Sequence, residues 1–212
     1  MPDFPSRGLY AITDGPRADL LQAVQQALAG GARLLQYRNL GADRPHRLAD
    51  ARALKRLCDE HDVPLLINGD AALAQAVGAA GVHLGETGEA LADARERLGP
   101  RAIIGVSCFD SLARARAMVA AGASYVSFGA FFPSPTLPHA RLASLQVLRQ
   151  SAALAVPRVA IGGITAENGA ALVDAGADYL ASISAVFGAT DVRHAAQRLA
   201  DLYRPSSSES HR

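Results

Sequence analysis

The feature that most constrains the fold is a regular alternation of short apolar runs with longer, Ala-rich segments. Each run is rich in Ile, Val, Leu or Tyr and is bounded by Gly, Pro or polar residues, which is typical of β-strands. Because the runs are almost continuously apolar, we expect strands that are buried on both faces, as in a parallel sheet. The runs lie at 8–14, 32–38, 64–69, 81–85, 102–108, 124–131, 157–163 and 178–187.

The segments between these runs have the pattern of helices that return the chain to the next strand. In 19–31 the apolar residues share one helical face and a Gly pair ends the helix. The same ending recurs at 76–81, 118–124 and 172–178. Eight strands with eight following helices predict an α/β fold, a single compact (β/α)8 TIM barrel with parallel strands. An open doubly wound sheet is the alternative, and the absence of a G-x-G-x-x-G turn argues against it.

The charge balance and the apolar content limit the classes of partner. The chain has 212 residues, with 21 Lys and Arg against 20 Asp and Glu. Such a balance argues against nucleic acid and against an anionic membrane surface as partners. No uninterrupted apolar run reaches the length of about 18 residues that a membrane span needs. We expect a soluble domain over residues 1–204 and a disordered polar tail over 205–212.

The cysteine content indicates a reducing compartment. Cys58 and Cys108 are separated by about fifty residues of chain, a spacing that fits neither a disulfide framework nor a zinc site. We therefore expect both thiols to be reduced and the protein to be cytoplasmic. Cys108 ends a strand with no Lys or His beside it, so we expect a buried, unreactive thiol. The sequence leaves a homo-oligomer open.

The last two strands end in features that suit a phosphate. Strand 7 is expected to end in AIGGI (160–164) and strand 8 in SIS (182–184), each followed by a helix. Glycines let a ligand approach the backbone closely, and the first amides of a helix are free to bind an anion. Phosphate commonly binds after strands 7 and 8 in this fold. The alternative is that the Gly pair only permits a tight turn.

Several segments in the same order resemble one known family. The chain resembles the thiamine phosphate synthase and TenI superfamily from LYAITD (9–14) to SISAVF (182–187). The matching segments are QYRN (36–39), LLIN (65–68), AVGAAGVHLG (76–85), IIGVSC (103–108), FGAFFPSPT (128–136) and AIGGIT (160–165). Synthases of this superfamily join a pyrimidine methyl diphosphate to a thiazole phosphate with Mg²⁺, and TenI-type relatives include a thiazole phosphate tautomerase.

The resemblance implies two groups of ligand-binding residues. On the thiazole phosphate side it implies backbone contacts from Gly163, Ile183 and Ser184. On the diphosphate side it implies side-chain contacts, for which the matching residues are Gln36, Arg38, Asn68, Ser107 and Thr136. Ser134, in the same loop as Thr136, offers a further hydroxyl for ligand binding.

The charged half of the diphosphate site is where this chain departs from the family. By the resemblance, synthases have Lys at the positions of Leu40 and Leu137, and metal-binding Asp at the positions of Gly69 and Gly88. Lysines and Mg²⁺ neutralise a diphosphate as the C–O bond breaks. Losing them together is expected to cost at least on the order of 10⁴ in rate. We therefore expect no metal or cofactor, with Mg²⁺ only if the chain is a synthase.

Two acidic residues could replace the missing metal ligands. Asp70 follows Gly69, and Glu86 follows the HLG segment. If the chain is a synthase, these two carboxylates are its candidate Mg²⁺ ligands. The alternative for Asp70, which we prefer, is the N-cap of the helix that begins at Ala71.

Three residues are candidates for catalysis: Arg38, His83 and Ser107. Arg38 ends the second run, where it could hold a phosphate, although a buried salt bridge is the alternative. His83 could move a proton, although a satisfied core histidine is the alternative. By the resemblance, the tautomerase uses a histidine just after the strand 6 glycine, where this chain has Ala130.

Three hypotheses follow. The first is a TenI-like, metal-independent protein of thiamine biosynthesis that binds thiazole phosphate or a similar small phosphate, with thiazole tautomerisation as its activity. The second is a thiamine phosphate synthase with relocated Mg²⁺ ligands. The third is a non-catalytic barrel whose ligand regulates binding to another protein. The sequence favours the first of these over the second.

Overall fold

Parallel strands close into a barrel in the part of the chain that the structure describes. The structure is a computed structural model, and it describes residues 4–86, 90–133 and 142–204. The strands pair in the order β1-β2-β3-β4-β5-β6-β7-β8, and β8 pairs with β1. They are β1 (Gly8–Ile12), β2 (Ala32–Tyr37), β3 (Leu65–Asn68), β4 (Gly81–Leu84), β5 (Ile103–Phe109), β6 (Tyr125–Phe128), β7 (Arg158–Ile161) and β8 (Tyr179–Ser182). The expected (β/α)8 barrel is confirmed.

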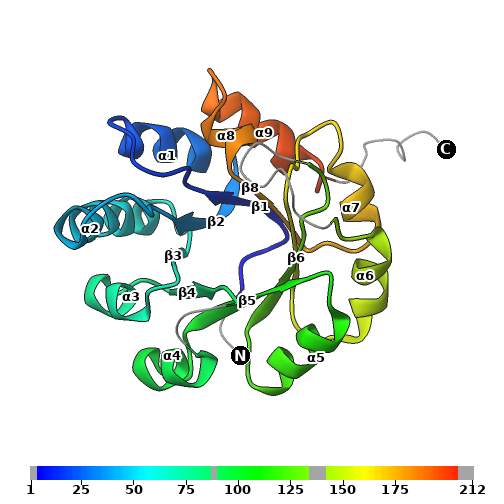
Figure 1. Ribbon diagram of the computed structural model, residues 1–212. Helices are drawn as coiled ribbons and strands as arrows, with labels where there is room; N and C mark the ends of the chain where they lie inside the picture. Colours follow the sequence, from blue (N-terminus) through cyan, green and yellow to red (C-terminus); the bar gives the residue numbers. More distant parts are fainter. Residues whose placement is uncertain (1–3, 87–89, 134–141, 205–212) are drawn as a thin grey trace.

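Helices surround the barrel on its outside (Figure 1). They are α1 (Leu20–Ala29), α2 (Arg44–Glu60), α3 (Ala71–Val77), α4 (Leu91–Leu98), α5 (Leu112–Ala120), α6 (Leu145–Gln150), the 3₁₀ turn η1 (Ser151–Ala153), α7 (Ala170–Asp174), α8 (Ser184–Phe187) and α9 (Val192–Asp201). Among the residues that the structure describes, no helix is both long enough and apolar enough to span a membrane.

The last apolar run of the sequence is longer than the strand that it contains, which ends near SIS (182–184) as expected. The run 178–187 contains β8 and then α8, and two helices rather than one follow β8. The pairing of β8 with β1 ends at Ser182, which is opposite Ala11. Beyond that point the chain has no strand partner, so it turns at Ile183 and begins a helix.

Alternate residues of each strand face the inside of the barrel, because side chains alternate across a strand. Tyr10, Leu34, Leu66, Tyr125 and Val159 belong to a buried cluster contributed by different strands. The residues between them pack outward against the helices in a larger cluster. The barrel is therefore a filled core with one end open to ligands rather than a pore.

One glycine makes room for the largest inward side chain. A Cβ on Gly105 of β5 would lie 1.9 Å from Cζ of Tyr125 on the neighbouring β6. The Tyr125 ring thus occupies the space that a side chain at position 105 would need. Its hydroxyl lies 2.9 Å from the hydroxyl of Tyr10 on β1. The absence of one side chain therefore lets β6 reach across the barrel to β1.

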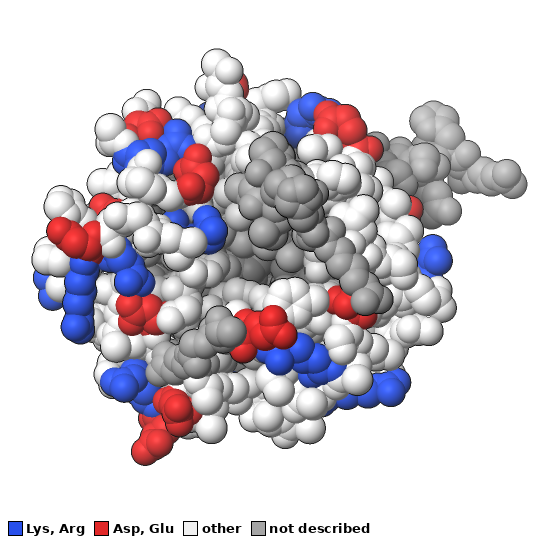
Figure 2. All heavy atoms as spheres, viewed as in Figure 1, with Lys and Arg blue, Asp and Glu red and all other residues white. Residues whose placement is uncertain are grey.

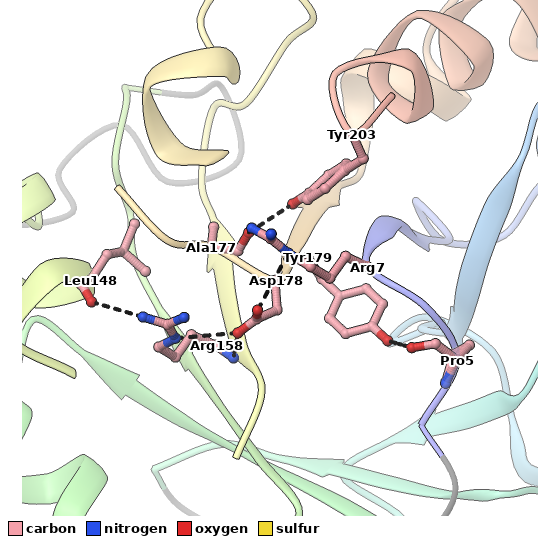
Figure 3. A network of polar contacts seen from close by, with 8 residues as sticks. All are labelled: Pro5, Arg7, Leu148, Arg158, Ala177, Asp178, Tyr179 and Tyr203. Atoms are coloured by element: carbon pink, nitrogen blue, oxygen red, sulfur yellow. Dashed lines mark hydrogen bonds and ion pairs between the residues drawn. The ribbon is translucent and has the colours of Figure 1, made fainter. Parts of the chain in front are cut away.

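A polar network joins the barrel strands at the end opposite the cavity described below (Figure 3). Asp178, just before β8, accepts hydrogen bonds from the backbone N–H and the Nε of Arg158, at 2.9 and 3.2 Å. Arg7, just before β1, forms an ion pair with Asp178 at 3.4 Å and donates to the carbonyl of Ala177. The hydroxyl of Tyr203 donates to the same carbonyl. These contacts tie the chain before β1 to β7, β8 and the end of α9.

The Gly105–Tyr125 packing gives a first testable expectation. Gly105→Ala should lower the free energy of unfolding by about 1–3 kcal/mol, because the new methyl group overlaps the Tyr125 ring. Urea denaturation followed by circular dichroism measures this. The matched control is Gly41→Ala, where the nearest atom to the new Cβ is Pro16 Cγ at 3.8 Å. Equal stability of the two variants would contradict the packing argument.

Candidate active site

A cavity of about 210 Å³ opens at the C-terminal ends of the strands. Its walls come from all eight strands or from the residues that immediately follow them. The lining residues are Tyr10, Ile12, Gln36, Arg38, Asn68, His83, Ser107, Ser127, Val159, Ile161, Ala181 and Ile183. The sequence analysis had selected six of these for ligand binding or catalysis: Gln36, Arg38, Asn68, His83, Ser107 and Ile183.

One side of the cavity is polar because the inward faces of β2 and β3 change character along their length. On β2 the inward residue Leu34 is followed two positions later by Gln36, and on β3 Leu66 is followed by Asn68. Leu34 and Leu66 are in the apolar core of the barrel, whereas Gln36 and Asn68 line the cavity. The two-residue period of a strand therefore separates a dry core from a polar site.

Five of the inward residues form one chain of hydrogen bonds. Nε2 of Gln36 lies 2.7 Å from the Tyr10 hydroxyl, which lies 2.9 Å from the Tyr125 hydroxyl. The Tyr125 hydroxyl lies 2.8 Å from Nδ1 of His83, and Nε2 of His83 lies 3.0 Å from Oγ of Ser107. Burial lowers the pKa of His83 to about 4, because the imidazolium form loses its hydration. At neutral pH the imidazole is uncharged and both of its nitrogens are occupied.

Arg38 is the one charged residue among the described residues that line the cavity. Its backbone is held on both sides by Thr13, whose Oγ1 donates to the Arg38 carbonyl at 2.9 Å and accepts from the Arg38 N–H at 2.8 Å. No hydrogen bond or ion pair joins the guanidinium to another described residue. The buried salt bridge that the sequence left open is therefore absent from the described part of the chain, and the guanidinium is available to an anion.

Free backbone amides lie next to the cavity after β7 and β8. The N–H groups of Gly163, Ile183 and Ser184 donate to no acceptor in the described part of the chain. Asn168 fixes the first of these loops, because its Oδ1 accepts from Thr165 N–H and its Nδ2 donates to the Gly163 carbonyl. Ile183 lines the cavity itself, whereas Gly163 and Ser184 are not among its lining residues. Unpaired amides of this kind suit a phosphate.

The Gly pair also has a packing role. Gly162 and Gly163 have φ angles of 104° and 63°. A Cβ on Gly162 would lie 2.4 Å from Cβ of Ala130, and one on Gly163 would lie 2.7 Å from the carbonyl oxygen of Phe132. The loop after β6 therefore packs directly on the Gly pair, so the tight turn considered as the alternative is present together with the free amide.

The carboxylate of Asp70 is already fully engaged. It caps α3, since its Oδ1 accepts from Leu73 N–H at 2.8 Å, and its Oδ2 pairs with Nη2 of Arg47 at 3.0 Å. Glu86 is exposed at the end of the loop after β4. Within the ranges that the structure describes, no group of three or more His, Cys, Asp or Glu side chains could hold a metal ion. The described side chains alone therefore form no cage for a metal ion, and the N-cap interpretation of Asp70 is confirmed.

Some positions where the resemblance implied contacts with the diphosphate or a metal ion are described by the structure, and others are not. Gly88, Ser134, Thr136 and Leu137 lie outside the described residues. Leu40 is 72% exposed and contributes no charge to the site.

Two other predicted residues are described. Ala130 is buried, with a methyl group where the tautomerase has its histidine. Cys108 is a free, buried thiol, as expected, and burial raises its pKa to about 11.

Sequence reasoning missed part of the site. Tyr10, Tyr125 and Thr13 were assigned to strands but were given no role, although they hold Gln36, His83 and Arg38 in position. The available signal was a polar atom on an otherwise apolar buried strand, because such an atom needs a hydrogen-bond partner.

Charge around the mouth of the barrel is mixed. Figure 2 shows Lys and Arg interspersed with Asp and Glu around the central hollow, with no continuous patch of one sign on this face. The ion pairs Arg17–Asp19 and Arg47–Asp70 account for part of this pattern, at 2.7 and 3.0 Å. Long-range attraction of a polyanion is therefore weak, and recognition depends on groups inside the cavity.

The fold and the cavity define a TIM barrel whose strand ends carry a small polar site. A family model described as "Thiamine monophosphate synthase" matches residues 9–186. The chain therefore belongs to the thiamine monophosphate synthase family, and the resemblance noted from the sequence is confirmed.

Curated relatives that are about 50% identical to this chain are described as thiamine-phosphate synthases. The chain is 49% identical over 212 residues to the thiamine-phosphate synthase of Thiobacillus denitrificans, covering 99% of this chain and 100% of that protein. It is 54% identical over 188 residues to the thiamine-phosphate synthase of Xanthomonas campestris pv. campestris, covering 88% and 90% of the two chains. A role in thiamine biosynthesis is thus supported, and the relatives favour the second hypothesis above over the first.

A solved structure agrees with this assignment. The thiamine phosphate pyrophosphorylase from Pyrococcus furiosus superposes with a TM-score of 0.83 at 35% identity, covering 92% of this chain and 94% of that one.

The partly buried His83 gives the second testable expectation. His83 should remain neutral in the folded protein down to about pH 4, whereas an unfolded histidine titrates near 6.5. Between these values the unfolded state binds the proton and the folded state does not. The free energy of unfolding should therefore fall as the pH falls, by about 3 kcal/mol at pH 4 from this group.

An NMR titration of the histidine Cε1–H signals measures the pKa. The control is His83→Gln, which should lose the corresponding part of the pH dependence of stability. A folded-state pKa near 6.5 for His83 would contradict the burial argument.

Proposed function

We propose that this protein binds a thiazole phosphate and a pyrimidine diphosphate and joins them, as a thiamine-phosphate synthase. In this reaction the bond between the pyrimidine methylene carbon and the diphosphate oxygen breaks, and the thiazole nitrogen bonds to that carbon. The observation that carries the proposal is a cavity that keeps Gln36, Arg38, Asn68, His83 and Ser107 together at the strand ends. Relatives that are about 50% identical and are described as thiamine-phosphate synthases support it.

Different residues of the site would bind the two phosphorylated groups. The amides of Gly163, Ile183 and Ser184 would bind the phosphate of the thiazole, since they lack other acceptors. Arg38 would meet the diphosphate, because its guanidinium has no partner among the described residues and can bind two oxygens at once.

The pyrimidine ring would lie in the cavity between these two anion-binding regions. Asn68 and Ser107 would offer it hydrogen bonds, and Ile183 an apolar contact. His83, being neutral and fully bonded, would hold Ser107 rather than transfer a proton itself.

Charge compensation is the weak part of this site. Asp70 already caps α3 with one oxygen and pairs with Arg47 through the other, so turning it toward a metal ion would cost both contacts. Arg38 would be the main cation opposite the leaving diphosphate, and we expect turnover to be slow for that reason.

A second candidate function is favoured by the contacts of Asp70. If the chain does not release diphosphate, it would be a metal-independent TenI-like protein that binds a thiazole phosphate, with tautomerisation or ligand-controlled regulation as its role. Asp70, committed to α3 and Arg47, favours this candidate, and Ala130 disfavours tautomerisation. In either case we propose a small phosphorylated ligand and a cytoplasmic location, and a homo-oligomer stays a prediction.

A product assay separates the two functions. Purified protein with pyrimidine diphosphate, thiazole phosphate and Mg²⁺ should form thiamine phosphate above a no-enzyme blank. Absence of product from a protein that still binds thiazole phosphate in calorimetry would overturn the synthase and favour the second candidate. Omitting Mg²⁺ in a parallel reaction tests whether the ion is required.

Arg38 gives the matching site variant. Arg38→Ala should reduce the rate or the affinity for pyrimidine diphosphate by roughly 10- to 100-fold, the usual effect of one charge-assisted hydrogen-bonding group. Thiazole phosphate affinity should change little, because the amides that would bind it follow β7 and β8, whereas Arg38 follows β2. Arg101→Ala, on the exposed turn before β5, is the control for a lost positive charge.

A further inference from the structure

The hydrogen bonds inside the barrel form a chain in which each group donates its proton toward the same end. It runs from Gln36 on β2 through Tyr10 on β1, Tyr125 on β6 and His83 on β4 to Ser107 on β5. Every donor–acceptor distance along it lies between 2.7 and 3.0 Å. Tyr10 and Tyr125 are 1% and 0% exposed, so their hydroxyls depend largely on each other and on their protein neighbours for hydrogen bonds.

The Gln36 end decides the direction. Nε2 of Gln36 carries only donor hydrogens, so the Tyr10 oxygen must accept. A tyrosine hydroxyl has a single proton, and the Tyr10 proton then has the Tyr125 oxygen as its acceptor. Tyr125 in turn donates its own proton to Nδ1 of His83. Reversing these bonds would leave the Tyr10 proton without an acceptor in a buried place, which is costly.

The direction then passes through the imidazole. A neutral imidazole has one N–H and one acceptor nitrogen. Because Nδ1 of His83 accepts from Tyr125, its proton is on Nε2 and is donated to Oγ of Ser107. The Ser107 oxygen is used as an acceptor, and its own proton has no acceptor among the described residues. Ser107 lines the cavity, so that proton is available to a ligand.

We propose that Gln36, Tyr10, Tyr125 and His83 act as positioning residues that make Ser107 a hydrogen-bond donor to the ligand. The part of the ligand that faces Ser107 is therefore a hydrogen-bond acceptor, such as an unprotonated ring nitrogen or an oxygen with a free lone pair. The inference rests on the proposed function only in placing a ligand in this cavity. No proton is transferred, since the chain selects one arrangement of protons and holds it.

The histidine tautomer is the direct test. In protein labelled with ¹⁵N-histidine, without ligand at pH 7, His83 should show a protonated Nε2 and an unprotonated Nδ1. His83→Gln identifies the signal by its loss. A protonated Nδ1 in the unliganded protein would mean that the Gln36 amide presents its oxygen to Tyr10 and that Ser107 donates to His83, and it would overturn the proposal.

A reversal variant tests the role of the first residue. Gln36→Glu replaces the donor by a carboxylate that only accepts. Each hydrogen bond from Tyr10 to Ser107 should then reverse its donor and acceptor, and His83 should become protonated on Nδ1. The matched control is Gln25→Glu on the exposed face of α1, which adds the same charge away from the chain. An unchanged His83 tautomer in Gln36→Glu would contradict control by Gln36.

Ligand binding is tested through a residue that does not touch the cavity. Tyr125 is absent from the described lining residues, so Tyr125→Phe can affect ligand affinity only through its neighbours. With thiamine phosphate as the probe in calorimetry, Ser107→Ala should weaken binding roughly 5- to 10-fold, and Tyr125→Phe by a smaller factor. In a Ser107→Ala background, Tyr125→Phe should have no further effect on affinity.

Additive losses in that double-mutant cycle would mean a general packing role for Tyr125 and would overturn the proposal. If wild-type protein does not bind thiamine phosphate, the proposed function fails at this site. The tautomers of the wild type and of Gln36→Glu still decide the direction of the chain in that case, so the two failures are distinguishable.

Discussion

The contact between Gly105 and Tyr125 is the constraint on which the site depends. Because Gly105 has no side chain, the Tyr125 ring fills the space beside β5, and its hydroxyl meets Tyr10 and His83 inside the barrel. A larger residue at position 105 would displace the ring and with it the hydroxyl that both neighbours need. The orientation of His83, and through it of Ser107, thus follows from a packing requirement in the core.

The closed barrel explains why the cavity is small and almost uncharged. On β2 and β3 the inward positions are apolar in the middle of the barrel and become polar one strand period later, whereas Ile12, Ile161 and Ile183 keep their side of the cavity apolar. Besides these aliphatic side chains, the described lining residues offer amide, hydroxyl and imidazole groups and one guanidinium, that of Arg38. Binding must therefore rely on matched hydrogen bonds and one strong cation rather than on a field of many charges.

Family membership and site chemistry disagree in the charged half of the diphosphate site. The relatives of about half identity are named as synthases, and the cavity keeps the side chains that the resemblance assigned to the pyrimidine diphosphate. The carboxylate nearest the position of the missing metal ligand is used instead for capping α3 and for pairing with Arg47. A carboxylate with both oxygens engaged is a poor metal ligand, because binding the metal would uncover the helix end and leave the arginine unpaired.

The sequence by itself determined the barrel, the family and the strand-end position of Gln36, Arg38, Asn68 and Ser107. Periodicity and glycine placement are local signals, and the strand ends of a parallel barrel meet at one face whatever the details of packing. It also indicated the end of β8 near Ser182 and the cap that Asp70 forms on α3. It did not indicate that Arg47 pairs with Asp70, or that the Arg38 guanidinium lacks a partner among the described residues.

Only the tertiary structure decided that the Arg38 guanidinium has no partner among the described residues, that Asp70 pairs with Arg47, and that Tyr10 and Tyr125 connect Gln36 to Ser107. These facts depend on distances between side chains of strands and helices that are far apart in the sequence, and no pattern within one segment contains those distances.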